Sequence, residues 1–213
     1  MKLYIAQATC SLAAQLIANE LRLSPELVHY DVKDRSTSNS ESFASVNPLF
    51  YVPVLELDNE ARDRITETIV VTSYLADQSP EAGLIPRAGT LDRVKYDQLL
   101  VFLATEIAQK HIPLMRKLLT EAGAEWTRNK LVNAYAVLDS RLADGRAYLT
   151  GDTFTVADAY VWATMWHERS GVQIGHLKNL MTYVARVEAR PSAQKALKDE
   201  AELVALHQSR AAA

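Results

Sequence analysis

The sequence predicts two successive domains, an α/β domain with a mixed sheet followed by an all-helical bundle. Short strand patterns alternate with helical patterns over residues 1–78, whereas only helical periodicity is found from Thr90 onward. A stretch rich in helix breakers, residues 78–83, separates the two parts. We therefore expect domains at residues 1–78 and 90–213, joined by a linker at 79–89.

In the first part, the order of elements is βαβ and then ββα. Thr9 is the expected N-cap of the first helix, and Asn47-Pro48 ends a short second helix. The β-branched run from Ile69 to Thr72 is assigned to a helix, although it also suits a strand. The expected strands are 3–6, 27–32, 53–57 and 64–66, and the expected helices are 10–22 and 67–77, with a loop at 33–41.

In the second part, apolar residues recur at helical spacing in three stripes. Pro113 is expected to kink or end the first of these helices. Thr155 and Asp158 have the spacing of a capping box before a further helix, so Asp158 is given a structural role. The stripes are Leu99, Phe102, Leu103 and Ile107; Leu131, Ala134, Tyr135, Leu138 and Leu142; and Leu177, Leu180, Met181, Val184 and Val187.

Composition excludes several classes of protein. A formal net charge of −3 gives no basic surface for nucleic acid or an anionic membrane. No apolar run approaches the ~20 residues that span a bilayer, and no signal peptide is apparent. One cysteine excludes an internal disulfide framework, and five scattered histidines indicate no metal site. We expect a reduced, cytoplasmic protein.

Three segments carry the residues most suited to chemistry. Cys10 stands at a helix start, where the helix dipole favours a thiolate, although a free cysteine is often only a small packing residue. If the Val52-Pro53 bond is cis rather than an ordinary trans bond, the backbone groups of Val52 point outward and can pair with an extended, peptide-like ligand. Glu67 and Thr68 begin another helix, where backbone N–H groups suit a carboxylate and Glu67 suits an ammonium.

These segments resemble those of a glutathione transferase, and the Cys-Ser-Leu-Ala form of the first is similar to the bacterial beta class. The resemblance covers almost the whole chain and implies a thioredoxin-like first domain, glutathione as substrate, and a homodimer. The segments are Thr9-Cys10-Ser11-Leu12-Ala13, Asn47-Pro48, Tyr51-Val52-Pro53-Val54-Leu55, Thr66-Glu67-Thr68 and Phe154-Thr155-Val156-Ala157-Asp158-Ala159-Tyr160.

The resemblance implies that Cys10 contacts the glutathione sulfur or forms a mixed disulfide with it. Ala13 stands where the thioredoxin motif has its second cysteine, so a dithiol mechanism is excluded. Ser11 is a weaker alternative thiolate donor. The residues expected to bind glutathione are Arg35, Tyr51, Val52, Pro53, Glu67 and Thr68. The alternative for Arg35 is an ordinary loop arginine that is exposed to solvent and has no role in binding.

The helical domain is expected to hold the second substrate, an apolar electrophile. His111 is expected to line the site of this second substrate, or else to be a surface histidine. Val101, Ala108 and Gln109 replace polar or basic residues typical of the beta class, and Leu49-Phe50 replaces Lys-Gly, which predicts an apolar cleft and slow conjugation. Thiol exchange, a non-catalytic binding protein of this fold, and a glutathione-dependent dehalogenase or etherase remain alternatives. The expected lining residues are Phe102, Gln109, His111, Trp162 and Trp166.

Overall fold

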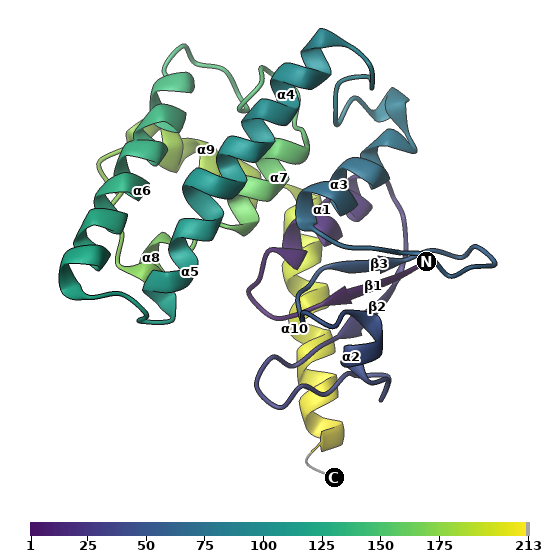
Figure 1. Ribbon diagram of the computed structural model, residues 1–213. Coiled ribbons are helices and arrows are strands. Elements are labelled where there is room, and N and C mark those ends of the chain that lie inside the picture. Colours follow the sequence, from purple (N-terminus) through teal and green to yellow (C-terminus); the bar gives the residue numbers. More distant parts are fainter. Residues whose placement is uncertain (212–213) are drawn as a thin grey trace. The chain divides into compact units, whose positions relative to one another are not determined.

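The chain forms two compact units, which a computed structural model describes over residues 1–211 (Figure 1). The first unit contains Met1–Ala82 and also the segment from Ala189 onward, and the second contains Gly83–Glu188. An α/β unit and an all-helical unit are thus present, as the two kinds of periodicity predict.

The first unit is built on a four-stranded mixed sheet in the order β2-β1-β3-β4. β1 runs parallel to β2 and antiparallel to β3, which in turn runs antiparallel to β4. Three of the observed strands are shorter than the apolar patterns, whereas the first has the expected length and begins one residue earlier. The observed strands are β1 (Lys2–Ile5), β2 (Glu26–His29), β3 (Val54–Glu56) and β4 (Arg64–Ile65).

The two faces of this sheet are covered by different helices. Tyr4, Val28 and Val54 pack with Phe43 and Val46 of α2 (Phe43–Val46) on one face. The helices α1 (Ser11–Glu20), α3 (Thr68–Asp77) and α10 (Pro191–Ala211) pack together, with α1 between the other two. A short η1 (Pro80–Ala82) follows α3.

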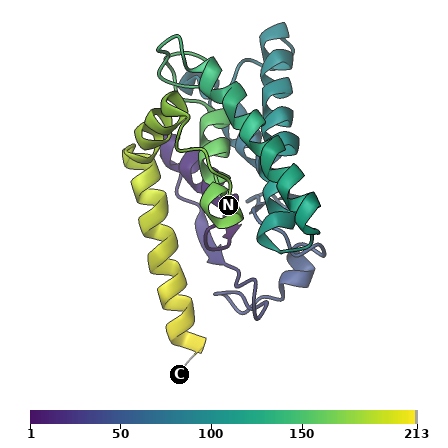
Figure 2. The ribbon, with the colours of Figure 1, turned by 90° about the vertical axis from the view of Figure 1, so that its left-hand side faces the viewer.

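The position of α10 departs from the boundaries expected from the sequence, because this helix packs within the first unit. It is one long helix (Figures 1 and 2) that lies against α1 and the edge strand β2. Just before it, Arg190 pairs with Glu20 of α1 at 2.8 Å. The first unit is therefore completed by a segment that follows the whole second unit.

In the second unit most residues of the expected stripes are buried, whereas Phe102, Met181 and Val184 are half-buried. Leu131, Tyr135 and Leu138 of α6 are fully buried, as are Leu180 and Val187 of α9. The helices are α4 (Leu91–Phe102), α5 (Gln109–Met115), α6 (Glu121–Arg141), α7 (Val156–Ala163), α8 (His167–Ser170) and α9 (Lys178–Glu188).

A π-helical segment, η2 (Leu103–Ala108), joins α4 to α5 and was not predicted. Here the Gln109 N–H bonds to the carbonyl of Ala104, five residues earlier. The ammonium of Lys110 donates to the Thr105 carbonyl at 2.9 Å, which satisfies a backbone acceptor in the widened turn. Pro113 lies inside α5, which ends two residues later at Met115.

Asp158 has the structural role expected of it. Its carboxylate accepts hydrogen bonds from the backbone N–H and the hydroxyl of Thr155, both at 2.8 Å. It also accepts from the Leu149 N–H and the Tyr183 hydroxyl, each at 2.9 Å. The buried carboxylate thus fixes the start of α7 and ties it to α9.

Candidate active site

Cys10 lies at the end of the loop between β1 and α1. It is the N-cap residue of α1, one position later than the expected Thr9, and its side chain makes no capping bond. Thr9 supports the turn instead, because its hydroxyl bonds the Ala6 carbonyl and the Ser11 hydroxyl, both at 2.8 Å. The Cys10 side chain is half-buried, so part of its surface remains accessible.

The Cys10 thiol meets the backbone that precedes β3. Its Sγ donates a hydrogen bond to the Val52 carbonyl oxygen at 3.3 Å. The Val52-Pro53 peptide bond is cis. Among the described residues, the Val52 N–H has no hydrogen-bond partner, so one backbone donor beside the thiol is available to a ligand.

The start of α3 supplies the third part of the site. Glu67 is the N-cap residue, with a positive φ of 65°, and its carboxylate is exposed. Thr68 is buried and hydrogen bonds through its side chain to Cys10. Three separate loops thus bring Cys10, Val52, Glu67 and Thr68 together.

The expected lowering of the Cys10 pKa is wrong. Burial raises the pKa of the thiol above its ordinary value, and the nearby Glu67 carboxylate raises it further. The Thr68 side chain and the Cys10 backbone act in the opposite direction but do not outweigh burial. The Val52 carbonyl also favours the protonated form, because it accepts from the thiol. The resting side chain is therefore a thiol.

Replacing Thr68 with valine is expected to raise the Cys10 pKa further, because the thiolate loses a hydrogen-bond donor. The rate of alkylation by iodoacetamide, followed as a function of pH, reports this pKa. Thr68→Ser is the matched control, since it keeps the hydroxyl and should retain the wild-type profile. An unchanged profile in Thr68→Val would show that Thr68 does not influence the thiol.

The remaining expected glutathione residues lie in the loops before β3. Arg35 is exposed, has a positive φ of 64° and stacks on the Phe50 ring at 4.7 Å. Tyr51 is exposed, and its carbonyl accepts from the Asn47 amide at 2.9 Å. Pro53 is buried. Asn47 was expected only as a helix end, yet its side chain also fixes the segment that leads to Val52.

Ser11 is excluded as an alternative thiolate donor. Its side chain is fully buried, and its hydroxyl is bonded to Thr9 at 2.8 Å and to the backbone of Ala6. Its role is to hold the turn before Cys10.

Glu200 of α10 is a site-supporting residue that sequence reasoning missed. One oxygen of its buried carboxyl accepts from the Ala8 N–H at 3.1 Å, two residues before Cys10. Burial raises the pKa of this carboxyl. No local pattern could have identified it, since the contact joins residues nearly at opposite ends of the chain.

The structure corrects one expected second-substrate residue. His111 is fully buried in the helical unit, where its two ring nitrogens bond Ser170 Oγ at 2.7 Å and the Tyr135 hydroxyl at 2.8 Å. It is therefore neither a surface histidine nor a lining residue. Phe102, Trp162 and Trp166 are half-buried and Gln109 is exposed.

Within residues 1–211, no helix has the length and apolar character needed to cross a membrane. In the same described part of the chain, no three His, Cys, Asp or Glu side chains are grouped as metal ligands would be.

Comparisons with known proteins agree with this architecture. The family model described as glutathione S-transferase, C-terminal domain, matches residues 89–167. Glutathione S-transferase GST-4.5 of Xanthomonas campestris pv. campestris is 31% identical over 94% of this chain and 98% of its own. A sphingomonad glutathione S-transferase, solved in complex with glutathione, is 34% identical with a TM-score of 0.87, over 94% of this chain and 99% of that one.

A beta-class enzyme of Sphingomonas chungbukensis is 33% identical with a TM-score of 0.86, and 94% of this chain and 98% of that one are covered. Because they cover 94% of the chain, these similarities extend over both units. The chain belongs to the glutathione S-transferase family.

Proposed function

We propose that this protein binds glutathione in its first unit and that Cys10 is the residue that meets the glutathione sulfur. The supporting observation is the meeting of Cys10, Val52 and Thr68, in which a half-buried thiol lies beside an unpaired backbone N–H. Family membership makes glutathione the ligand to test first.

Each part of glutathione has a matching group in this proposal. The Val52 N–H donates to the carbonyl of the cysteinyl residue, as in strand addition. The α-carboxylate of the γ-glutamyl end accepts from the Thr68 backbone N–H, and the ammonium of the same γ-glutamyl end pairs with Glu67. Arg35, held on Phe50, binds the glycine carboxylate, and Tyr51 and Pro53 border the ligand.

The chemistry we propose for Cys10 is thiol exchange. The Cys10 thiolate attacks one sulfur of glutathione disulfide, so that a Cys10–glutathione disulfide forms and one glutathione thiolate leaves. A second glutathione thiolate then attacks the mixed disulfide, regenerates Cys10 and releases glutathione disulfide. Each step breaks one disulfide bond and forms another, so no external oxidant or reductant is needed.

The second proposed reaction is slow conjugation of apolar electrophiles. The glutathione sulfur forms the new bond and the leaving group departs with its electron pair. Negative charge on that sulfur is best stabilised by fixed hydrogen-bond donors or cations. The raised pKa of Cys10 shows that its surroundings do not favour a negatively charged sulfur. We propose that Phe102, Gln109, Trp162 and Trp166 of the helical domain contact the electrophile.

Calorimetric titration with glutathione tests the proposal. We expect binding, and we expect Glu67→Ala to weaken it about tenfold, because one charged hydrogen bond contributes roughly 1.5 kcal/mol. Glu60→Ala, in the exposed turn between β3 and β4, is the control and should bind as the wild type does. Heat signals absent at millimolar glutathione would refute the assignment.

We also propose a cytoplasmic homodimer. Leu91, Val94 and Val101 form an exposed apolar stripe on α4, and Leu49 and Tyr51 are exposed on the first unit. Phe50, between them, packs partly against the core of its own unit. A lone reduced cysteine suits the cytoplasm.

The expected result from light scattering at micromolar concentration is twice the 23.7 kDa chain mass. Val94→Asp should shift the mass toward the monomer, because it places a charge in the apolar stripe. Glu125→Asp, at an exposed position on α6, serves as the control. A monomer mass for the wild type would contradict the dimer.

A further inference from the structure

The turn that leads to Cys10 contains a residue in an unusual backbone conformation. Ala8 has a φ of 55°, in the left-handed region, although it is not a glycine. A Cβ atom makes this region unfavourable, so contacts with the surroundings must hold such a residue there. Cys10 follows two residues later as the N-cap of α1. The conformation of Ala8 therefore sets the direction in which the chain enters α1 and places the thiol.

The contact that holds Ala8 comes from Glu200 of α10. Only 6% of Glu200 is exposed, and one of its carboxyl oxygens accepts from the Ala8 N–H at 3.1 Å. The other oxygen is buried and has no hydrogen-bond partner among the described residues. Burial raises the pKa of this carboxyl, and the Ala8 hydrogen bond opposes that rise. The contact is thus made by one acceptor oxygen and does not depend on a paired charge.

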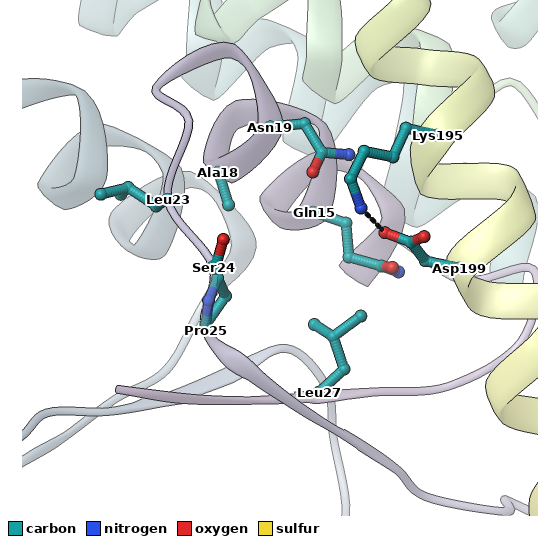
Figure 3. A pocket seen from close by; sticks show the side chains of 9 residues that line it. All are labelled: Gln15, Ala18, Asn19, Leu23, Ser24, Pro25, Leu27, Lys195 and Asp199. Carbon is teal, nitrogen blue, oxygen red and sulfur yellow. Dashed lines mark hydrogen bonds and ion pairs between the residues drawn. The ribbon is translucent and has the colours of Figure 1, made fainter.

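The part of α10 that precedes Glu200 is fixed against α1. The Asn19 amide donates to the Ser192 carbonyl at 3.0 Å. Figure 3 shows Lys195 and Asp199, an ion pair on α10, beside Asn19 of α1 at a small pocket. Glu200 is the next residue of the helix, so its carboxyl is presented to the Ala8 turn by an element already held in place.

We propose that Glu200 is a positioning residue for Cys10, whose acceptor oxygen keeps Ala8 in the left-handed conformation and so aims the thiol at bound glutathione disulfide. This inference rests on the proposed thiol exchange. A reacting atom that is displaced by about 1 Å can lower a rate by roughly a hundredfold. A change in the turn therefore affects the reaction, although Glu200 itself does not touch the ligand.

Two measurements on the full-length protein test this role. Iodoacetamide alkylation over a range of pH gives the pKa of Cys10 without any glutathione. The rate of mixed-disulfide formation with glutathione disulfide is then divided by the alkylation rate at the same pH. Both reactions consume the same thiolate, so this exchange ratio does not depend on the thiolate fraction. It reports how well the thiol is placed toward bound glutathione disulfide.

Glu200→Leu removes the acceptor oxygen and keeps a side chain of similar size. We expect the exchange ratio to fall about tenfold, which corresponds to about 1.4 kcal/mol, the order of the cost of a left-handed residue that is not glycine. The pKa of Cys10 should fall toward its ordinary value, because a thiol released from the turn is less buried. Glu202→Leu, at an exposed position on the same helix, should change neither quantity.

Two changes separate the acceptor oxygen from other properties of Glu200. Glu200→Gln keeps an acceptor oxygen and removes the ionisable group, so it should retain the exchange ratio and the Cys10 pKa of the wild type. Adding Ala8→Gly to Glu200→Leu should restore the ratio to within about threefold of the wild type, because glycine adopts the left-handed conformation readily.

A third change tests the turn with Glu200 in place. Ala8→Val should lower the exchange ratio and the Cys10 pKa as Glu200→Leu does, because a β-branched side chain disfavours the left-handed region further. This variant leaves α10 untouched, so it tests the turn even if Glu200→Leu does not fold.

The proposal is overturned if Glu200→Leu or Ala8→Val folds and keeps the alkylation profile or the exchange ratio of the wild type. It is also overturned if Glu200→Gln loses as much as Glu200→Leu, or if Ala8→Gly restores nothing. A wild type that does not exchange with glutathione disulfide would refute the proposed function instead. The alkylation profiles, which need no glutathione, would then still decide whether Glu200 positions Cys10.

Discussion

Replacing Cys10 with alanine should abolish thiol exchange with glutathione disulfide while glutathione binding persists. The exchange requires a sulfur at position 10, and the chain contains no second cysteine that could substitute for it. The proposed binding contacts come from Val52, Glu67 and Thr68, which this change leaves in place. After incubation with glutathione disulfide, mass spectrometry should show one added glutathione per wild-type chain and none on Cys10→Ala.

The pH dependence of the exchange gives the same prediction a second readout. Because burial raises the Cys10 pKa, the reactive thiolate is a minor form at neutral pH. Below the pKa its fraction, and hence the exchange rate, rises about tenfold for each pH unit, up to at least the ordinary cysteine value of about 8.5. Equal exchange by Cys10→Ala, or an unmodified wild type, would show that Cys10 only fills space.

The helical unit should lose about 3 kcal/mol of its stability as the pH falls from 7 to 4, through His111 alone. Burial, aided by His167, lowers the pKa of His111 from 6.5 to about 4. Below pH 6.5 the unfolded chain therefore binds a proton at this site that the folded unit excludes. The contribution of His111 to stability is fully present above its pKa in the unfolded chain. It is lost as the pH falls to its pKa in the folded unit, near 4.

Denaturant unfolding at several pH values, followed by tryptophan fluorescence, measures this effect. Trp166 is a suitable reporter, because its ring lies edge-on to that of His111 at 6.3 Å. His111→Gln keeps a polar side chain but cannot titrate. It should be less stable than the wild type at pH 7 and lose about 3 kcal/mol less on acidification. Parallel stability curves for the two proteins would contradict the assignment to His111.

Much of the fold could be predicted from the chain because its elements obey local rules. The buried stripe of α6, with Leu131, Tyr135 and Leu138, repeats at helical spacing. Asp158 has the spacing of a helix cap and forms those bonds. The Cys10, Val52 and Thr68 segments each precede or follow a regular element, so their places in the topology were predictable.

What remained unpredicted depends on contacts between distant residues. The Glu200 carboxyl accepts a hydrogen bond from Ala8, which lies 192 residues earlier in the sequence. Local periodicity cannot predict a contact between residues so far apart. The dipole of α1 was visible in the sequence, but the depth of Cys10 was not, and burial decides the direction of its pKa. His111 likewise lacked any signal that Tyr135 and Ser170 would enclose it.

The return of the chain to its first unit has a consequence for synthesis on the ribosome. Residues 83–188 are translated before α10, yet the Ala8 loop that leads to Cys10 is held by Glu200 of that helix. The nascent α/β unit therefore remains without this support until the helical unit has already emerged. During this interval the surface of α1 that α10 covers in the folded chain remains uncovered.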